Sequence, residues 1–307
     1  MNKIGIIGAG LIGRAWAIVF ARAGWSVTLY DSAAEVRARV KSDILASLQE
    51  LTEYGLGADI AAAEPRIHVA DTIAKMVEGA SFVQENGPET IEAKLAIFGE
   101  LDRLAPADAI LASSSSAIVA SRFTEKLKTR VRCLVAHPVN PPHLVPIVEL
   151  APAPWTSPDT VSRAKAIYES VGQVPILVKK EVEGFILNRL QGALLAEAFR
   201  LVGEGYVSPR DLDKTIKDGL GLRWSFLGPF ATIELNAPGG VADYCARYLG
   251  FYRRLQDDPP NSAYTEANLK RVMKQWDAAP VTNMPGMMKD RDTRLAALRA
   301  HKAKFKD

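Results

Sequence analysis

The sequence predicts an α/β protein with a mostly parallel sheet, helices on both faces and a helical insertion, followed by a smaller all-helical domain. Three observations lead to this fold class. Short apolar runs alternate with amphipathic segments up to about residue 180. A glycine-rich turn lies between the first apolar run and the first helix. After Glu183-Gly184 no strand pattern stands out, and long amphipathic segments follow. We therefore expect two domains, at residues 1–181 and 182–307.

Eight strands are expected in the first domain, at residues 3–7, 26–30, 66–69, 81–84, 109–112, 132–136, 146–150 and 175–178. The connection from Asp31 to the strand near residue 66 has about 35 residues, whereas a crossover needs only about 12. Leu45, Leu48 and Leu51 are spaced for a helix in this connection. A projecting helical pair is therefore expected, and a solvated excursion without a further role is the alternative. A long helix over 185–202 begins the second domain.

The composition excludes several classes of protein. A net charge of +3 with mixed signs does not suggest a nucleic-acid partner. The two cysteines, Cys133 and Cys245, provide neither a disulfide framework nor a zinc motif, so no metal site is expected. No apolar run reaches the roughly 18 residues needed to span a bilayer. The first residues run directly into a strand, so we expect no signal peptide and a cytoplasmic protein.

A dinucleotide site is predicted where the first strand meets the first helix. The run Gly8-Ala9-Gly10-Leu11-Ile12-Gly13 fits the G-x-G-x-x-G pattern and lies inside a βαβ unit. The first glycine permits the tight turn, the second lets the backbone approach a pyrophosphate, and the third lets helix and strand pack closely. The helix N-terminus would then hold the phosphates. A tight turn without a ligand is the alternative.

Asp31 indicates which dinucleotide binds. It ends the second strand, where a carboxylate can accept hydrogen bonds from the ribose hydroxyls of the adenosine. Its charge would repel a 2′-phosphate, so NAD is expected rather than NADP. Arg37 and Arg39 could counter that charge, but we expect both to face solvent on the following helix.

Four polar sites interrupt apolar surroundings. Ser113–Ser116 follow one strand, His137 ends another, Glu149 lies within an apolar run and Asn188 lies early in the first helix of the second domain. Each has an ordinary explanation, such as a turn, a satisfied backbone group or a structural ion pair. Together they supply what alcohol oxidation requires: a base for the hydroxyl proton, a carboxylate that orients the base, and donors to the oxygen.

Four segments carry a resemblance to a known family: GAGLIGRAWA (8–17), AHPVNPP (136–142), KEVEGFILNRLQ (180–191) and GLGLRW (219–224) with Gly228-Pro229. On these segments the chain resembles the 3-hydroxyacyl-CoA dehydrogenase family across nearly its whole length. The resemblance implies a Rossmann-type first domain, NAD as cofactor, and a second domain through which relatives form dimers. We expect a homodimer, and the apolar stretches 226–235 and 249–252 agree with this.

The resemblance also assigns roles to residues. It implies that His137 is the general acid/base, that Glu149 orients it, and that Ser116 and Asn188 hydrogen-bond the reacting oxygen. Because the serine run is ambiguous by one residue, Ser115 is the alternative to Ser116. Two further residues, Glu89 and Lys94, match the segment that approaches the ribose on the nicotinamide side. Here the chain departs from the family by carrying Asn86-Gly87 where relatives have larger residues, which we interpret as local loop variation.

The family acts on acyl-CoA and free-acid substrates, and its acyl-CoA members bind the phosphates of coenzyme A with basic residues on the helical pair. Residues 42–65 here contain no Lys or Arg but five acidic residues, a charge that repels phosphates. We therefore expect NAD-dependent oxidation of a small free 3-hydroxy acid to the 3-keto acid. Within the family, the resemblance implies L-gulonate as the favoured substrate. Alternatives are 3-hydroxybutyryl-CoA, carnitine, or a non-catalytic structural role as in lens crystallins.

Arg223 is the candidate for recognising the substrate. It follows Gly219 and Gly221 and precedes Trp224, in a segment that we expect to be a tight turn between two helices. We expect the apolar residues on either side of Arg223 to exclude water from it. A guanidinium there can bind a carboxylate through two parallel hydrogen bonds. The alternative is an arginine that clamps helix ends or crosses a dimer interface.

Overall fold

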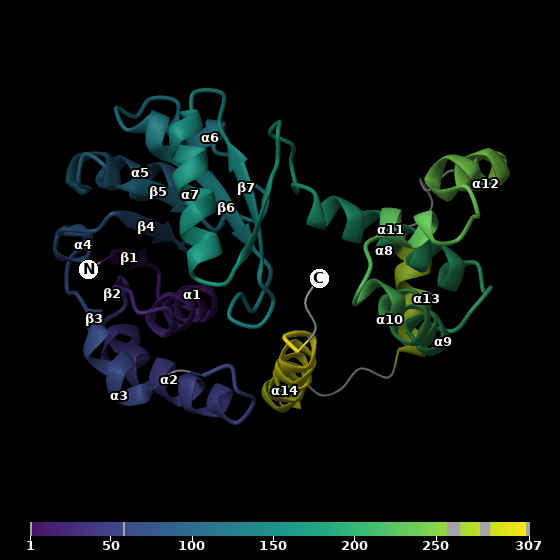
Figure 1. Cartoon of the computed structure of the whole chain (residues 1–307), viewed down its shortest axis with the longest axis horizontal. Coiled ribbons are helices and arrows are strands. Elements are labelled where there is room, and N and C mark those ends of the chain that lie inside the picture. The colour runs from purple at the N-terminus through teal and green to yellow at the C-terminus, as the bar shows by residue number, and fades with distance from the viewer. Residues whose placement is uncertain (1, 58, 257–264, 277–282, 305–307) are drawn as a thin grey trace. The chain divides into compact units, whose positions relative to one another are not determined.

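The computed structural model describes residues 2–57, 59–256, 265–276 and 283–304. Its centre is an eight-stranded sheet with the order β3-β2-β1-β4-β5-β6-β7-β8 (Figure 1). The strands are β1 (Lys3–Ile7), β2 (Ser26–Tyr30), β3 (Ile67–Val69), β4 (Phe82–Glu85), β5 (Ile110–Ser113), β6 (Cys133–Pro138), β7 (Ile147–Pro152) and β8 (Val174–Leu177). All eight expected strands are present, with ends that differ from the prediction by one or two residues.

The sheet confirms the expected Rossmann-type architecture. The first six strands follow the order 3-2-1-4-5-6, and neighbouring strands are parallel throughout except for the antiparallel pair β6–β7. Most residues of the strands between the two edges are buried because helices cover both faces, which explains the nearly continuous apolar runs in the sequence. The edge strands β3 and β8 are largely exposed or half-buried. The order places the carboxyl ends of β1, β4, β5 and β6 along one edge, where ligands bind in open α/β sheets.

Two apolar clusters pack on the sheet. One includes Trp16 and Phe20 of α1 (Leu11–Arg22) with Tyr168 of α7 (Pro158–Ser170). The other includes Phe98 of α5 (Ile91–Leu104) and Phe123 of α6 (Ser121–Thr124). Further short elements are α4 (Ile73–Val77) and the 3₁₀ turns Glu64–Arg66 and Arg130–Arg132.

The insertion after β2 is one long helix and one short one, α2 (Ala34–Thr52) and α3 (Ile60–Ala63). Val40, Ile44, Leu48 and Leu51 of α2 are buried in the core cluster that contains α1. The insertion is therefore packed on the domain by one face, as the leucine spacing predicts, and is not a fully solvated excursion.

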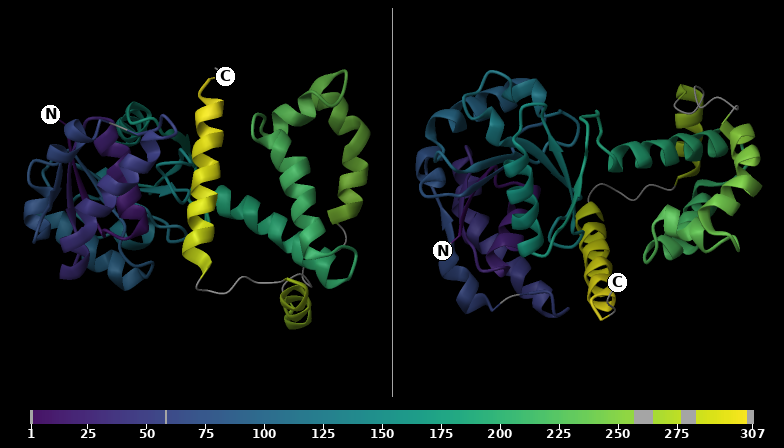
Figure 2. Two further views of the ribbon diagram at one scale, coloured as in Figure 1. Left: turned by 90° about the horizontal axis from the view of Figure 1, so that it is seen from below. Right: turned by 45° about the horizontal axis from the view of Figure 1, so that its top comes forward.

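The described residues form two compact units, one of Met1–Asn188 with Pro285–Asp307 and one of Arg189–Met284. The last helix, α14 (Met284–Lys302), thus belongs to the unit that contains the sheet, where Ala296 is buried in the core (Figure 2, yellow). The expected boundary between two domains, at residues 181 and 182, stays a prediction.

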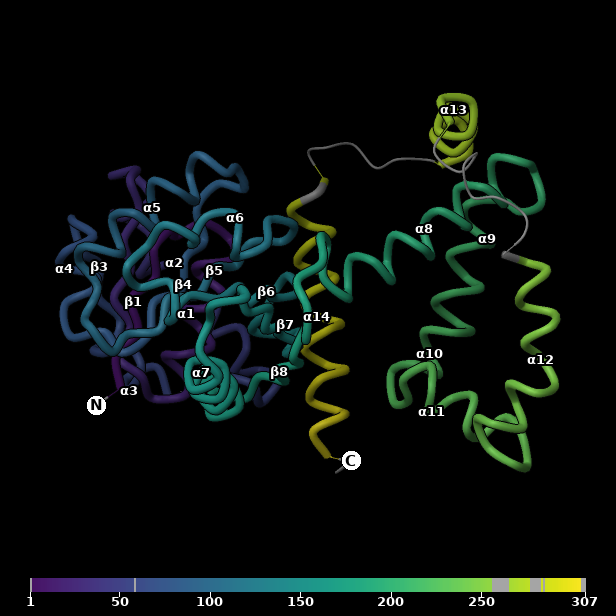
Figure 3. The backbone as a smooth tube through the Cα atoms, turned by 90° about the horizontal axis from the view of Figure 1, so that it is seen from above, coloured from purple at the N-terminus to yellow at the C-terminus, as the bar shows by residue number. Residues whose placement is uncertain are grey.

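The second unit consists of helices. They are α8 (Leu187–Gly203), which begins in the first unit, and then α9 (Pro209–Lys214), α10 (Gly221–Trp224), α11 (Pro229–Glu234), α12 (Gly240–Gln256) and α13 (Glu266–Gln275) (Figure 3). Within the described part of this unit no strand occurs, so the expected all-helical character is confirmed. In the same described residues of the whole chain, no helix combines the length and apolarity that a membrane crossing requires.

One local expectation was wrong. Residues Thr215–Leu220 form a π-helical segment that continues directly into α10, so Gly219 and Gly221 lie in helix and not in a tight turn. A glycine costs an exposed helix only about 1 kcal/mol relative to alanine, which neighbouring helical residues offset. At Gly221 a Cβ would lie 2.9 Å from the carbonyl oxygen of Ile216, so the wider helix favours a residue without a side chain.

Candidate active site

The glycine-rich turn has the geometry that a dinucleotide requires. Gly8 has φ of +85°, and a Cβ there would lie 2.5 Å from the carbonyl oxygen of Asn86. A Cβ on Gly13 would overlap the carbonyl oxygen of Gly8, so α1 can approach β1 this closely only with glycine. Gly10 has no heavy atom within 4 Å of a hypothetical Cβ, which leaves space beside the backbone for a ligand. The tight turn at Gly8 and the close packing at Gly13 are as the sequence predicts, and the approach of a pyrophosphate to Gly10 stays a prediction.

The N-terminus of α1 is available to an anion. The N-cap is Gly10, no side chain caps the helix, and the first turn has no acidic residue. The N–H groups of Leu11, Ile12 and Gly13 therefore have no partner within the helix and can bind phosphate oxygens. The residues present fit a dinucleotide on this turn.

Asp31 lies beside the turn at the end of β2. Its Oδ2 accepts from the N–H of Ala9 at 2.8 Å and its Oδ1 from the N–H of Ala33 at 2.9 Å. The carboxylate therefore braces the glycine-rich turn and stays half-exposed at the position where a ribose would bind.

The expectation that Arg37 faces solvent was wrong. Its Nη1 donates to the carbonyl oxygen of Asp31 at 2.6 Å, and its guanidinium lies 5.9 Å from the centroid of the Tyr30 ring. The cation–π contact and the backbone hydrogen bond fold this side chain back over the end of β2. A positive charge therefore lies next to Asp31.

His137 and Glu149 meet on neighbouring strands. They are paired in the antiparallel register of β6 and β7, and Nδ1 of His137 lies 2.8 Å from Oε2 of Glu149. Both side chains are buried. Burial alone would raise the pKa of Glu149, but hydrogen bonds from His137 and from the backbone N–H groups of Leu187 and Ile186 lower it below its usual value. The carboxylate is therefore ionised and can orient the imidazole.

The start of α8 completes this arrangement. The N–H groups of Ile186 and Leu187 donate to Oε1 of Glu149 at 2.8 and 3.0 Å. The chain reaches this position through Gly184 and Phe185, with φ of +74° and +49°, and a left-handed phenylalanine is uncommon. The Phe185 ring is fully buried, with its centroid 5.4 Å from that of His137. Backbone strain at Phe185 is thus balanced by contacts that support the His137–Glu149 pair.

The hydroxyls of Ser115 and Ser116 differ in their hydrogen bonding. Ser115 is fully buried, and its Oγ contacts Oε1 of Glu89 and the carbonyl oxygen of Ile118. Ser116 is half-exposed, and among the described residues its Oγ has no hydrogen-bond partner. Nδ2 of Asn188 donates to the carbonyl oxygen of Ser116 at 2.9 Å, so these two expected site residues are brought together. The geometry favours Ser116 as the hydroxyl that can meet a substrate.

Glu89 shapes the serine loop. Its Oε1 accepts from Ser115 Oγ and from the N–H groups of Ser116 and Ala117 at 2.6, 3.0 and 3.1 Å. Burial would raise the pKa of Glu89, but these hydrogen bonds and Lys94 lower it. The second oxygen, Oε2, lies 3.9 Å from Nζ of Lys94.

Lys94 is buried, with 1% of its surface exposed. Its Nζ donates to both carboxylate oxygens of Glu85 at 2.8 and 2.9 Å and to the carbonyl oxygen of Gly87 at 3.3 Å. The three donors of the ammonium are therefore already used within the protein. Direct contact of Lys94 with a ribose stays a prediction.

The sequence analysis did not identify Glu85 and Asn86, which connect the ends of β4 and β5 at the edge of the sheet where the candidate site lies. Glu85, at the end of β4, also accepts from Ser113 Oγ at 2.6 Å and from the N–H of Gly87 at 2.5 Å. A Cβ on Gly87 would lie 2.5 Å from Cδ1 of Ile97 and 2.9 Å from Oε1 of Glu85, so a side chain there would displace the ends of these two side chains. Asn86 accepts from Ser114 Oγ at 2.7 Å. Asn86-Gly87 is therefore part of the site, and an acidic residue ending an apolar strand was the available signal.

Arg223 lies in α10 of the second unit and is exposed there, as are Leu222, Trp224 and Phe226. The expected exclusion of water by these apolar neighbours is not found within the unit. Arg223 lines a shallow surface hollow with Leu222, Phe226 and residues of the π-helical segment. Its part in binding a substrate stays a prediction.

Comparison with known proteins decides the family. The model of the 3-hydroxyacyl-CoA dehydrogenase NAD-binding domain matches residues 3–182, and that of the C-terminal domain matches residues 184–288. The chain belongs to this family. A 3-hydroxyacyl-CoA dehydrogenase family member with this NAD-binding domain is an NAD-dependent oxidoreductase that acts on the CH–OH group of a 3-hydroxy acid.

Individual relatives agree with the family. A lambda-crystallin homolog from Bos taurus is 45% identical over 278 residues, 88% of this chain and 85% of the relative. An L-carnitine dehydrogenase from Burkholderia mallei is 39% identical over 242 residues, 79% and 74% of the two chains. The crystal structure of 5-formyl-3-hydroxy-2-methylpyridine 4-carboxylic acid 5-dehydrogenase, described as an NAD⁺-dependent dismutase, matches with TM-score 0.82, 27% identity and 97% coverage of both chains.

Proposed function

We propose that this dehydrogenase oxidises a small free 3-hydroxy acid, with L-gulonate as the favoured substrate, to the 3-keto acid. The observation that carries the proposal is the buried His137–Glu149 pair at 2.8 Å, near the loop that presents the unpaired hydroxyl of Ser116 and the side chain of Asn188. A base held by a carboxylate and polar groups for the oxygen are what the oxidation of a secondary alcohol requires.

In the proposed reaction His137 removes the hydroxyl proton. Its Nδ1 faces Glu149, so Nε2 is the nitrogen left to accept that proton. Glu149 stabilises the imidazolium that results, while Ser116 Oγ and Asn188 hydrogen-bond the reacting oxygen. Bound NAD supplies the hydride acceptor. In reverse, the same imidazolium returns the proton to the alkoxide.

Cofactor binding is assigned to the residues that fit it. The N–H groups of Leu11, Ile12 and Gly13 would hold the pyrophosphate, and Asp31 would accept the adenosine ribose hydroxyls. Glu89, with a partly exposed carboxylate, would meet the ribose on the nicotinamide side. We propose that Lys94 supports it chiefly by holding Glu85 and the carbonyl of Gly87.

A free acid is preferred to a thioester because of the insertion. Residues 42–65 supply no cation for the phosphates of coenzyme A. Two of the acidic residues on α2 are already paired, Asp43 with Arg14 at 2.6 Å and Glu50 with Lys289 of α14 at 3.1 Å. The insertion therefore repels phosphate less than the sequence suggests. The proposed preference for a free acid depends mainly on the lack of Lys and Arg in residues 42–65.

A second candidate is carnitine oxidation. It is favoured by the similarity to an L-carnitine dehydrogenase, which is 39% identical over 242 residues. Carnitine is also a 3-hydroxy acid with a free carboxylate, so both candidates place the same demand on Arg223 and the same chemistry on His137.

The test is NADH production over a panel of L-gulonate, L-carnitine, 3-hydroxybutyrate and 3-hydroxybutyryl-CoA. The expected result is the highest kcat/KM with L-gulonate. A higher value with the thioester would overturn the free-acid proposal, and a higher value with L-carnitine would select the second candidate. No turnover with any of the four would favour a non-catalytic structural role.

We also propose a cytoplasmic homodimer with sequence domains at 1–181 and 182–307. In the single chain the second unit exposes Phe226, Phe230, Leu235 and Phe251, an amount of apolar side chain that suggests a partner surface. Cys133 and Cys245 are unpaired, in keeping with a reducing compartment. Light scattering at micromolar concentration tests the assembly, because a monomer mass would contradict it.

A further inference from the structure

The first unit contains two arginines that share one acceptor. Arg22 ends α1, and Arg299 lies in the last turns of α14. Both donate through Nη1 to the carbonyl oxygen of His143, at 3.0 and 2.6 Å. His143 lies in the loop between β6 and β7, six residues after His137. Two guanidinium groups from opposite ends of the sequence therefore meet at one backbone oxygen.

Their charges are not compensated. Within the described ranges neither Arg22 nor Arg299 forms an ion pair with a carboxylate, whereas most other arginines of α14 do, such as Arg291 with Asp292 and Arg294 with Asp290. Burial and the neighbouring Arg299 lower the pKa of Arg22 to about 10. A carbonyl oxygen offers only a partial negative charge, so two nearby positive charges in a half-buried place are unfavourable without an anion.

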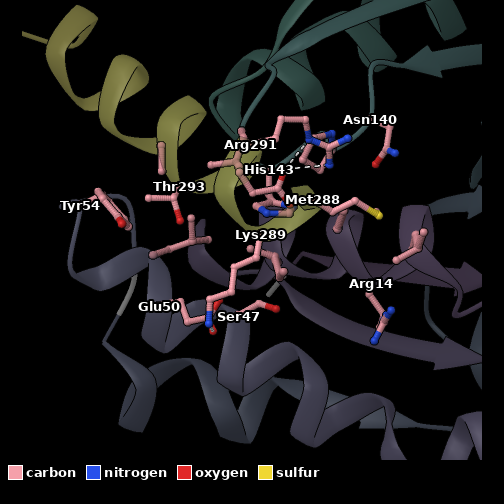
Figure 4. Close-up of a pocket in the computed structure, with 18 of the residues that line it drawn as sticks. Arg14, Ser47, Glu50, Tyr54, Asn140, His143, Met288, Lys289, Arg291 and Thr293 are labelled. Atoms are coloured by element: carbon pink, nitrogen blue, oxygen red, sulfur yellow. Dashed lines mark hydrogen bonds and ion pairs between the residues drawn. The ribbon is translucent and has the colours of Figure 1, made fainter. Parts of the chain in front are cut away.

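A cavity adjoins His143, whose carbonyl oxygen this pair shares, and its lining includes neither Arg22 nor Arg299. The cavity has a volume of about 640 Å³ and is lined by α1, α2, the loop that contains His143, and α14 (Figure 4). Nδ1 of His143 is buried and has no hydrogen-bond partner in the part of the chain that the structure describes, which is uncommon for a buried polar atom. Arg291 lies beside His143 in the lining, and Lys289 reaches Glu50 of α2. Of the three acidic residues in the lining, Glu50 and Asp292 are already paired and Glu53 is the third.

The pKa of the His143 imidazole is lowered by burial and by the positive charges around it. After burial, the charges of Arg22, Arg299 and Arg291 are what lower the pKa of His143, to about 4. The three guanidinium groups therefore act on the same point from α1 and α14. Among the described residues Nε and Nη2 of Arg22 make no hydrogen bond, so this arginine keeps donors for a ligand.

We propose that Arg22, Arg299 and the imidazole of His143 form a binding site for a phosphate group, separate from the dinucleotide turn, and that the bound anion fastens α14 to the sheet-containing unit. Guanidinium groups match phosphate geometry and form charge-assisted hydrogen bonds with it. The anion supplies the missing negative charge and an acceptor for Nδ1 of His143. The inference is independent of which 3-hydroxy acid is oxidised.

Calorimetric titration of the whole chain with inorganic phosphate tests the site. The protein is saturated with NAD first, so that the glycine-rich turn is occupied and cannot take up the phosphate. We expect saturable binding in the wild type and a Kd weakened about tenfold or more in Arg22→Gln and Arg299→Gln, because each variant loses a charge-assisted hydrogen bond. Arg299→Lys keeps the positive charge at this position, so it should weaken phosphate binding less than Arg299→Gln does.

The matched control is Arg294→Gln on the same helix, an exposed arginine whose partner is Asp290. It removes one positive charge from α14 and should leave the Kd unchanged. An equal Kd in wild type, Arg22→Gln and Arg299→Gln would overturn the proposal, as would a loss of equal size in Arg294→Gln. Absence of saturable binding in the NAD-saturated wild type would also overturn it.

Hydrogen exchange of residues 284–302 provides a second readout. Phosphate should slow exchange in α14 of the wild type and of Arg294→Gln, but not of Arg22→Gln, when sodium chloride of equal ionic strength is the reference. Equal slowing by chloride would overturn the proposed fastening of α14. A repeat with glycerol 3-phosphate distinguishes the source of the phosphate, since tighter binding assigns a phosphate monoester and weaker binding assigns the free ion.

Discussion

His137 and Glu149 face each other across an antiparallel strand pair, and both oxygens of the Glu149 carboxylate are occupied. Oε2 meets Nδ1 of His137 at 2.8 Å, and Oε1 accepts two backbone N–H groups at the start of α8. The carboxylate therefore ties the base on β6 to the helix that supplies Asn188. The Glu149 side chain thus helps to position both His137 and the start of the helix that contains Asn188.

The first prediction concerns this pair. His137→Ala should lower kcat by a factor of about 10² or more, the usual size of a general acid–base contribution, while NAD affinity stays the same. Glu149→Gln should lower kcat less, because it disturbs the orientation of the base without removing it. Steady-state kinetics and NAD titration measure both effects. Near-normal turnover of the His137 variant would end the proposed mechanism.

The second prediction separates two adjacent serines. Ser116→Ala should lower kcat without changing the melting temperature, since its Oγ has no partner among the described residues. Ser115→Ala should instead destabilise the fold by about 0.5–1.5 kcal/mol, because it removes the hydrogen bonds that this buried hydroxyl makes with Glu89 and Ile118. Thermal unfolding and kcat are measured for both variants. The reverse pattern would assign the catalytic hydroxyl to Ser115.

The third prediction concerns cofactor choice. Wild type should show a far higher kcat/KM with NAD than with NADP, because a 2′-phosphate would meet the carboxylate of Asp31. Asp31→Ala should narrow the gap, since Arg37 lies beside the vacated position. The double variant Asp31→Ala with Arg37→Ala is the matched control and should gain less NADP activity. Comparable kcat/KM values for NAD and NADP in the wild type would refute the assignment.

The fourth prediction is a pH dependence. Burial and the charges of Arg22, Arg299 and Arg291 lower the pKa of His143 from 6.5 to about 4. The unfolded chain then binds more protons than the folded one between these two pH values, so stability falls as the pH decreases through this window. The loss amounts to at most about 3 kcal/mol. Denaturant unfolding in phosphate-free buffer at both ends of the window measures it.

His143→Asn is the comparison for that experiment, since it keeps the backbone carbonyl that binds Arg22 and Arg299. The variant should lose less stability than the wild type over the same pH range. An equal loss in both proteins would mean that other groups cause the dependence.

Much of the sheet could be predicted because the strands between its two edges are buried on both faces. Each strand is then a short run of apolar residues, bounded by turns and visible without knowledge of its neighbours. The last helix could not be placed in this way. Ala296 of α14 is buried against the first unit, and Lys289 pairs with Glu50 far away in the sequence. No local pattern signals contacts between residues so distant along the chain.

Candidate site residues could be selected from the sequence where residue type and chemistry coincide, and their roles stay predictions. His137, Glu149 and Asn188 are polar residues in apolar surroundings, which buried structure tolerates only with partners. Glu85 and Asn86 were missed because their partners come from α5, from the end of β5 and the serine that follows it, and from Gly87, and their spacing has no motif. The glycines at 219 and 221 misled, because a pattern typical of a turn lies here within a helix.

The last prediction concerns Arg223, the residue that we propose recognises the substrate. We propose that its guanidinium binds the free carboxylate of the hydroxy acid through two parallel hydrogen bonds. Arg223 is exposed in α10, and among the described residues of its own unit no carboxylate pairs with it, so its guanidinium has donors available for a ligand. Arg223→Lys keeps the charge but loses the planar fork, so KM for the hydroxy acid should rise about tenfold or more.

NAD affinity and melting temperature should stay unchanged in Arg223→Lys, because the residue belongs to neither the dinucleotide turn nor the core. Lys217→Arg, on the preceding π-helical segment, is a matched exchange of the same two cations at an exposed position and should leave KM unaltered. An unchanged KM in Arg223→Lys, or a fall in melting temperature that parallels the loss of activity, would favour a structural arginine. It would also restore the acyl-CoA alternative, since a thioester presents no carboxylate for this residue to bind.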